Sequence, residues 1–292
     1  MINHRVHKTI PRWSMFIIAT ACFSTTFSQQ VHKAMSFNIR YDNPGDSLNA
    51  WPLRKDLVAS QVRFHRAGIL GVQEALHQQV LDLSSRLPTY AYIGAGRDDG
   101  KWKGESCSIF YDSSLYRKLD AGHLWLSETP ELAGSKGWDA SLPRMLSWVA
   151  LQTINGSQVF FVFNTHFDHM GKKARAESAR MILKQVQQIS GSSPAIIMGD
   201  FNATPSDEPV QIITDQKNPL HLTDSRQLSA GGHYGPNGSF NGFGPREQME
   251  EPIDFIFLKG KWTVLQHAAL SQTWQGRFAS DHFAIYAELM LP

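Results

Sequence analysis

Apolar strands that end abruptly in polar side chains constrain this chain more than any other feature. In IIMGDFNATPSDEPV, residues 196–210, an apolar run meets Asp200 and, two residues later, Asn202. A packed core excludes such groups unless they are hydrogen-bonded. Each polar ending alone is explained by a turn or a helix cap. Together, however, they predict several strand ends that meet at one polar rim. The other endings are Asn38, Glu74, residues 164–168, Asp254, and Asp281 with His282.

The apolar spacing predicts helices between groups of strands. Helices are expected at 54–68, 76–87 and 171–190, and the first should bury Leu57, Val58, Val62 and Phe64. An Asn-Gly pair between two apolar runs predicts a β-hairpin over 143–167. Because no shift in composition divides the chain, we expect one α/β domain with two mixed sheets packed face to face and helices outside. The other strands are expected at 31–41, 69–74, 90–95, 105–111, 115–126 and 195–198, and in three segments near the C-terminus.

The first 28 residues differ from the rest. They begin with basic residues and no acid, continue with a short apolar run, and end in small polar residues. This order is typical of a secretory signal peptide, here cleaved after Ser28. The run is too short for a stable membrane span. We therefore expect an exported protein, periplasmic or extracellular, with a mature domain at 29–292. Lipoprotein anchoring through Cys22 is less favoured, since a small alanine stands three residues before it.

Removal of this segment leaves a nearly neutral chain with one cysteine. It takes away Arg5, Lys8 and Arg12 and leaves 25 basic against 26 acidic residues. Such a protein has no overall attraction to nucleic acid, although a local basic patch is still allowed. Cys107 then has no disulfide partner, and its apolar surroundings predict a packing role.

The polar endings resemble those of a known superfamily. SFNIRY, GVQEAL, FFVFNTHFDH, IIMGDFNATPSDEPV, PIDFIF and ASDHFAIYAEL occur in the order of the endonuclease/exonuclease/phosphatase superfamily, over residues 31–292. The resemblance is greatest to secreted bacterial members and the deadenylase-like branch. It implies a DNase I-like fold, which is a four-layered α/β sandwich, and phosphoester hydrolysis that depends on Mg²⁺ or Mn²⁺.

The resemblance also implies metal ligands. Glu74 matches the metal carboxylate of the family, and Asn38 and Asp281 are the additional ligands. A hard cation held by oxygen atoms offsets the charge of a phosphate and polarises it. The alternative for Glu74 is an acid at the start of the next helix, where the helix dipole favours it.

Two residues of the GDFN motif are expected to act on the water and the phosphate. Asp200 is the candidate general base or water anchor. Asn202 carries an amide donor that can reach a non-bridging oxygen. If the strand continues through residue 202, the two side chains lie on the same side of it.

The remaining candidates would contact or support the phosphate. His282 resembles the histidine at the scissile phosphate, and Asp254 is expected to hydrogen-bond its other ring nitrogen. His166 resembles the second phosphate-facing histidine. Glu105 either orients His166 or is simply a charged residue at a strand start. Arg144 is either a phosphate-binding guanidinium or a surface arginine.

These residues leave several functions open. A Mg²⁺-dependent phosphodiesterase or nuclease is favoured. A phosphomonoesterase or a lipid-headgroup hydrolase is the alternative, and an inactive binding module is a further one. A zinc site at His166-x-x-His169 is disfavoured because aspartates dominate the rim and no cysteine is nearby. The expected partner is a phosphoester, with nucleic acid as one candidate, and a monomer is the default expectation.

Overall fold

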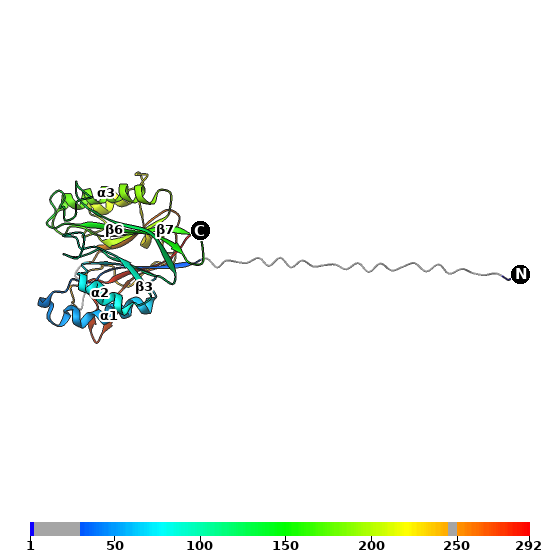
Figure 1. The fold of residues 1–292 in the computed structure, drawn as a ribbon, viewed down its shortest axis with the longest axis horizontal. Coiled ribbons are helices and arrows are strands. Elements are labelled where there is room, and N and C mark those ends of the chain that lie inside the picture. Colours follow the sequence, from blue (N-terminus) through cyan, green and yellow to red (C-terminus); the bar gives the residue numbers. More distant parts are fainter. Residues whose placement is uncertain (3–29, 245–249) are drawn as a thin grey trace.

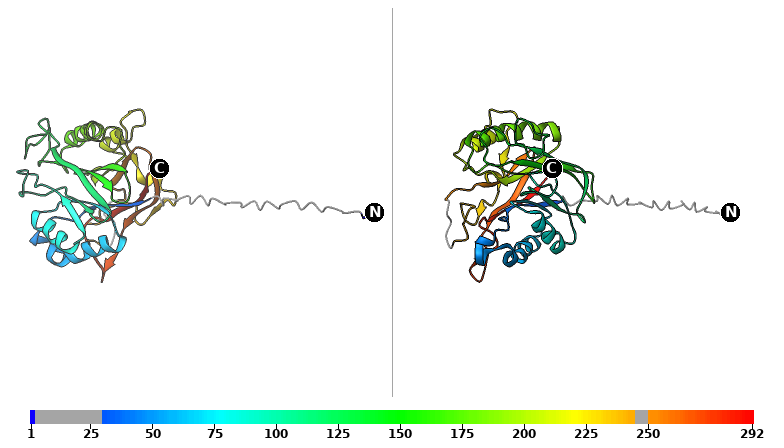
Figure 2. Two further views of the ribbon diagram at one scale, coloured as in Figure 1. Left: turned by 45° about the vertical axis from the view of Figure 1, so that its right-hand side comes forward. Right: turned by 60° about the vertical axis from the view of Figure 1, so that its left-hand side comes forward.

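Two β-sheets packed face to face form the centre of the protein, with helices on both outer sides (Figures 1 and 2). The computed structural model describes residues 1–2, 30–244 and 250–292. Apart from its first two residues, the predicted signal segment 1–28 lies outside the described residues. The α/β sandwich expected from the sequence is confirmed.

The seven-stranded sheet is mixed and has the order β10-β12-β15-β1-β2-β4-β3. At its centre β1 pairs in parallel with β2 and antiparallel with β15. This arrangement places the end of β1, the end of β2 and the start of β15 at one edge of the sheet. The bounds are β1 (Val31–Asn38), β2 (Ile69–Gln73), β3 (Tyr90–Ile93), β4 (Ile109–Asp112), β10 (His233–Tyr234), β12 (Thr263–Leu270) and β15 (Ala284–Met290).

The six-stranded sheet has the order β5-β6-β7-β8-β11-β9 and is also mixed. Here β7 and β8 are parallel, and β11 runs antiparallel to β8, so the ends of β7 and β8 meet the start of β11. The predicted hairpin is present as β6 and β7. The bounds are β5 (Tyr116–Trp125), β6 (Met145–Thr153), β7 (Val159–His166), β8 (Ala195–Asp200), β9 (Thr223–Asp224) and β11 (Asp254–Lys259).

The helices cover the two outer faces. Figure 1 shows α1 (Trp51–His65) and α2 (His77–Arg86) on the side of the seven-stranded sheet, and α3 (Lys172–Ser190) on the opposite side. The shorter elements are η1 (Pro44–Asn49), α4 (Glu208–Thr214), α5 (Ser225–Leu228), and the ribbon of β13 (Thr273–Trp274) and β14 (Arg277–Phe278). Within the described residues, no helix combines the length and the hydropathy that a membrane crossing requires.

Strand β8 shows why its sequence is continuously apolar. Ile196 and Met198 pack in the core between the sheets, whereas Ile197 packs in the core beneath α3. Because both faces of the strand are buried, every position is apolar until the strand reaches the rim.

Two expectations about the elements are wrong. Phe64 is 82% exposed, although it was expected on the buried face of α1 with Val58 and Val62. Two residues turn a helix by about 200°, so a side chain two positions after Val62 faces away from the core. The strand expected at 105–111 begins only at Ile109, because Ser106 forms an isolated bridge with Ala75 instead.

Candidate active site

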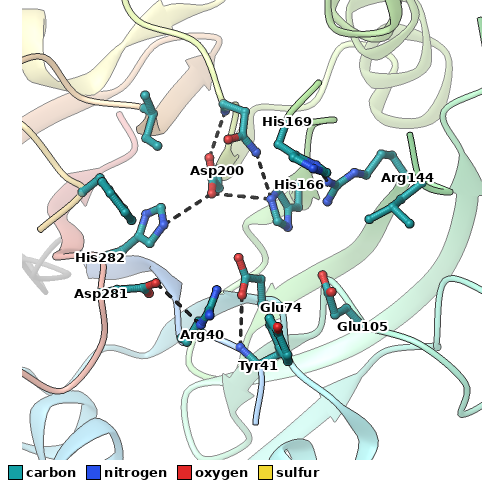
Figure 3. A pocket seen from close by; sticks show the side chains of 14 residues that line it. Arg40, Tyr41, Glu74, Glu105, Arg144, His166, His169, Asp200, Asp281 and His282 are labelled. Carbon is teal, nitrogen blue, oxygen red and sulfur yellow. Dashed lines mark hydrogen bonds and ion pairs between the residues drawn. The ribbon is translucent and has the colours of Figure 1, made fainter. Parts of the chain in front are cut away.

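A cavity of about 580 Å³ opens at the rim where the polar strand ends of both sheets meet. Most of the predicted site residues line it, and Figure 3 shows their side chains pointing toward one another. Asn38 and Asp254 lie directly behind the wall and are buried. The predicted residues on the wall are Glu74, Glu105, Arg144, His166, Asp200, Asn202, Asp281 and His282.

Asn38 joins the two sheets beneath the cavity. Its Nδ2 donates to Asp200 Oδ2 at 2.9 Å and to Glu74 Oε1 at 3.1 Å, while its Oδ1 accepts from the backbone N–H of Arg40 at 3.0 Å. The amide therefore presents nitrogen to the carboxylates. The amide oxygen accepts one hydrogen bond and keeps a second lone pair, so the role of Asn38 as a metal ligand stays a prediction.

Glu74 and Asp281 supply oxygen atoms on one side of the cavity. Glu74 adopts a left-handed backbone conformation with φ of 61°, and its Oε2 accepts from the N–H of Tyr41 at 3.1 Å. Burial, and further the charge of Glu74, raise the pKa of Asp281 above its ordinary value. Two carboxylates on the wall of one cavity fit a hard divalent cation, which prefers oxygen ligands and offsets their charge.

The GDFN segment turns sharply instead of continuing as a strand. β8 ends at Asp200, and Asn202 adopts a left-handed φ of 46°. The N–H of Asn202 donates to Asp200 Oδ1 at 2.9 Å, and its Nδ2 donates to Phe167 O and to His166 Nε2, both at 3.0 Å. A turn therefore brings both side chains to the cavity wall, which corrects the expectation based on strand alternation. The side-chain amide of Asn202 therefore holds the His166 ring and the backbone that directly follows β7.

The two imidazoles have opposite tendencies to ionise. Burial, followed by the charge of Arg144, lowers the pKa of His166 well below its ordinary value. Burial alone would lower the pKa of His282 too, but Asp254 raises it well above that value. His282 Nδ1 lies 2.8 Å from Asp254 Oδ2, as expected. These opposite pKa directions favour the imidazolium form of His282 and the neutral form of His166.

Asp200 lies between these two rings. Its Oδ2 is 3.6 Å from His166 Nε2 and 3.8 Å from His282 Nε2. Burial, together with the charge of Asp254, raises the pKa of Asp200 to about 7. A carboxylate with such a pKa can accept a proton near neutral pH.

Asp200, Asp254 and His282 also form a buried cluster whose ligand atoms all lie within 4.8 Å of one another. Asp254 Oδ2 already accepts from His282 Nδ1 and from Ser239 Oγ, the latter at 2.6 Å. A protonated imidazole has no free lone pair for a metal. While His282 is protonated, Glu74 and Asp281 are other oxygen donors on the cavity wall that could hold a cation.

Glu105 and Arg144 occupy the opposite end of the cavity. Glu105 forms a two-point ion pair with Arg97, at 2.6 and 2.9 Å, so the expectation that it orients His166 is not supported. Burial raises the pKa of Glu105, and Arg97 opposes that shift. Arg144 is only 4% exposed, so it is not a surface arginine. Its Nε donates to Asp168 at 3.3 Å.

Comparison with known proteins agrees with this geometry. The sequence profile of the Endonuclease/Exonuclease/phosphatase family matches residues 35–282. The chain belongs to this family. The fold and the family make it a hydrolase of phosphoesters, although the comparison alone does not select the substrate.

Solved family members from Bacteroides are similar along their whole length. The endonuclease/exonuclease/phosphatase from Bacteroides vulgatus is 38% identical with a TM-score of 0.86, over 90% of this chain and 100% of that one. A mannosyl-6-phosphatase of Bacteroides thetaiotaomicron VPI-5482 is 36% identical with a TM-score of 0.84, over 89% and 100%. The uncharacterized protein R895 of Acanthamoeba polyphaga mimivirus is 23% identical over 257 residues, which are 76% of this chain but 37% of that protein.

The two histidines of the zinc alternative, His166 and His169, both lie on the cavity wall. His166 Nε2 accepts from Asn202, and His169 Nδ1 lies 3.0 Å from Arg144 Nη2, which can only donate. Each histidine thus has one ring nitrogen engaged with an N–H group. Among the described residues, the group of three side chains that could hold a metal is Asp200, Asp254 and His282, and the zinc alternative, which the residue types disfavour, stays a prediction.

The supporting contacts of four residues escaped the sequence analysis. Asp168 and His169 stand in the FFVFNTHFDH motif, but nothing there indicates that they hold Arg144. Arg97 lies in a glycine-rich loop, and Ser239 lies in another. Their contacts bridge 8 to 25 residues of loop and strand and follow no helix or strand period, so spacing carries no signal for them.

Proposed function

We propose that this enzyme is a phosphomonoesterase that uses Mg²⁺ or Mn²⁺ and acts on the phosphate ester of a small polar alcohol such as a sugar. The observation that carries this proposal is that the arginines on the cavity wall are paired with acids. Arg40 pairs with Asp46 at 3.0 Å and Arg144 with Asp168 at 3.3 Å. A groove that binds a nucleic-acid backbone requires a track of cations that are free to contact phosphates. Arginines that are already paired with acids do not form such a track. The similarity to a mannosyl-6-phosphatase also supports a sugar phosphate.

Several side chains at the cavity have a chemical role in this reaction. Glu74 and Asp281 would hold the cation, which polarises the phosphoryl group and offsets its charge. Asp200 accepts the proton of the attacking water, because its pKa of about 7 matches the working pH of a general base. His282 donates from Nε2 to a phosphate oxygen as an imidazolium, and Asp254 keeps it charged.

The remaining residues orient these groups. Asn38 fixes the Asp200 carboxylate from the other sheet. Asn202 holds that same carboxylate through its backbone N–H and fixes His166 through its side chain. These contacts hold the reacting groups in fixed positions before the substrate binds.

Phosphate release from a hexose 6-phosphate tests the proposal. We expect hydrolysis with Mg²⁺, loss of activity with EDTA, and a fall in kcat of about 10²–10⁴ for Asp200→Ala. Asp120→Ala, on the exposed part of β5, is the matched control and should keep full activity. The circular dichroism spectrum should be unchanged in both variants.

Two outcomes would contradict the proposal. Activity that survives complete chelation would remove the metal from the reaction. Cleavage of single-stranded DNA or RNA without hydrolysis of any sugar phosphate would instead establish the phosphodiesterase that the sequence favoured.

A further inference from the structure

A second large cavity lies on the outer side of the seven-stranded sheet. Its volume is about 440 Å³, and among the described residues none lines both this cavity and the one that contains Asp200. Ala268 and Leu270 of β12 line it and belong to the core cluster beneath α1, which places it on the helix side of the sheet. We call it the outer cavity, and its main side chains are His65, Tyr234, Gln266, His267, Gln272 and Tyr286.

The outer cavity is electrically neutral. Among the described residues that line it, none is an aspartate, glutamate, lysine or arginine. Burial, followed by the charge of Lys33, lowers the pKa of His65. Burial, followed by the charge of His233, lowers the pKa of His267 to about 3. Both imidazoles are thus favoured in their neutral form at neutral pH. A phosphate or a nucleic acid would meet no cation here, and a hard metal ion would meet no carboxylate.

Aromatic rings stand at the edge of this cavity. Tyr234 lines it and is 75% exposed. From the other side, the ring of Tyr286 contacts His65 with centroids 5.4 Å apart, and His65 contacts Phe64 at 5.2 Å. Phe64 is the exposed aromatic residue near the end of α1. Aromatic side chains that gather on a surface without being covered mark an interaction site.

Two exposed amides add hydrogen-bonding groups to these rings. Gln266 lies on β12, and Gln272 follows that strand. The Oε1 atom of Gln272 accepts from Gln61 Nε2 at 3.0 Å, so the side chain is held in place and its own nitrogen is still a donor. The backbone of Gly232 borders the cavity and is open, since a Cβ atom added there would have no neighbour within 4 Å. A ligand can therefore approach closely.

A neutral sugar has the chemistry that matches these groups. Each hydroxyl of a pyranose both donates and accepts hydrogen bonds, as a side-chain amide does. The C–H groups on one face of the ring pack against an aromatic side chain, whose face carries partial negative charge. The volume of the cavity lies within the roughly 300–1,000 Å³ of sites for small ligands. A lipid chain would not need the amides.

We propose that the outer cavity is a non-catalytic site that binds a neutral oligosaccharide, with Tyr234 as the stacking ring and Gln266 and Gln272 as hydrogen-bonding groups. This binding does not depend on the proposed hydrolysis and goes beyond it. If both hold, the outer cavity keeps the enzyme on a glycan while the active site removes phosphate groups from it.

Nuclear magnetic resonance of ¹⁵N-labelled protein tests the proposal. The probes are neutral trisaccharides of glucose, of galactose and of mannose. We expect at least one of them to bind with a Kd of about 1 mM and to shift the amide signals of Gly231, Gly232 and β12. Tyr234→Ala should weaken this binding about tenfold, and Gln266→Ala about threefold or more. Trp102→Ala is the matched control, because Trp102 is an exposed aromatic residue outside the outer cavity.

A competition experiment separates the two cavities. Inorganic phosphate with Mg²⁺ should leave trisaccharide binding unchanged, and its displacement of the sugar would place the sugar in the active site and overturn the second site. Equal affinities of Tyr234→Ala and wild type would also overturn it, as would the absence of binding by all three trisaccharides at about 20 times the expected Kd. Self-association that Tyr234→Ala abolishes, without any sugar binding, would instead identify an interface between copies of the chain. None of these results depends on whether the protein hydrolyses a sugar phosphate.

Discussion

Among single residues, Asp200 shows most directly how a functional group opposes folding. It is 1% exposed and lies close to Asp254, so its ionised form is costly in the absence of a bound cation. The positive charge of His282 offsets only part of this cost, since the pKa of Asp200 still rises to about 7. Selection for stability alone would not place an aspartate at this position. Such a destabilising residue is typical of a catalytic position.

The stability of the metal-free protein should therefore depend on pH through Asp200. Since the folded-state pKa of Asp200 lies above its value of 3.8 in the unfolded chain, the folded state binds the proton more tightly. The stability that the folded state gains by binding this proton is present at low pH and is lost as pH rises through about 7. In EDTA, Asp200→Asn should stabilise the protein by about 1–2 kcal/mol near pH 8, and by less near pH 5.

Urea unfolding of both proteins across this pH range measures the effect. Asp120→Asn, on the exposed part of β5, is the matched control and should leave the slope of stability against pH unchanged. A free energy of unfolding that is lower for Asp200→Asn than for wild type at pH 8 would show that Asp200 is not strained by its burial.

At the scale of single elements, Gly199 shows how closely two strands approach. A Cβ atom at Gly199 would lie 2.2 Å from the carbonyl oxygen of Thr165, which belongs to the neighbouring strand β7. No real structure tolerates such a contact, so the strands would have to separate next to His166 and Asp200. We expect Gly199→Ala to lower the free energy of unfolding by about 2–4 kcal/mol and to reduce activity further.

The control for this substitution is Gly231→Ala. There the nearest atom to an added Cβ is the carbonyl oxygen of Leu265 at 4.0 Å, so the substitution should be almost neutral. Urea unfolding compares the two variants. Equal stabilities of Gly199→Ala and wild type would mean that β7 and β8 can move apart freely.

The elements also show what the sequence can and cannot predict. Polar residues at strand ends, such as Asp200 after β8 and Asp281 before β15, were predictable, because an apolar run bordered by a polar group is a local pattern. The partner of Glu105 was not, since Arg97 reaches it from a loop with no recognisable spacing. Arg54 was predicted only as part of a helix. It is buried and donates to the carbonyl oxygens of Ile39 and Ala279, which joins segments 240 residues apart.

For the whole molecule, the site is divided between the two sheets. The seven-stranded sheet provides Glu74, Asp281 and His282 at its strand ends, and the six-stranded sheet provides His166 and Asp200. Contacts between the two halves are direct. Asn38 bonds to Asp200, and His282 to Asp254. Sequence order could not show this division, because it depends on which strands pair in space.

A bound cation should therefore stabilise the whole fold. Binding to the folded state alone stabilises a protein by about 2.7 kcal/mol when the ligand is at 100 times its Kd. We expect saturating Mg²⁺ to raise the thermal midpoint by several degrees in wild type and to have little effect in Glu74→Gln, which keeps an acceptor for the N–H of Tyr41 but removes the charge. Glu177→Gln, on the exposed face of α3, is the matched control and should respond as wild type does. Scanning calorimetry with Mg²⁺ and with EDTA measures both shifts.

An equal shift in Glu74→Gln and wild type would place the cation elsewhere, and the cluster of Asp200, Asp254 and His282 would then be the site to test.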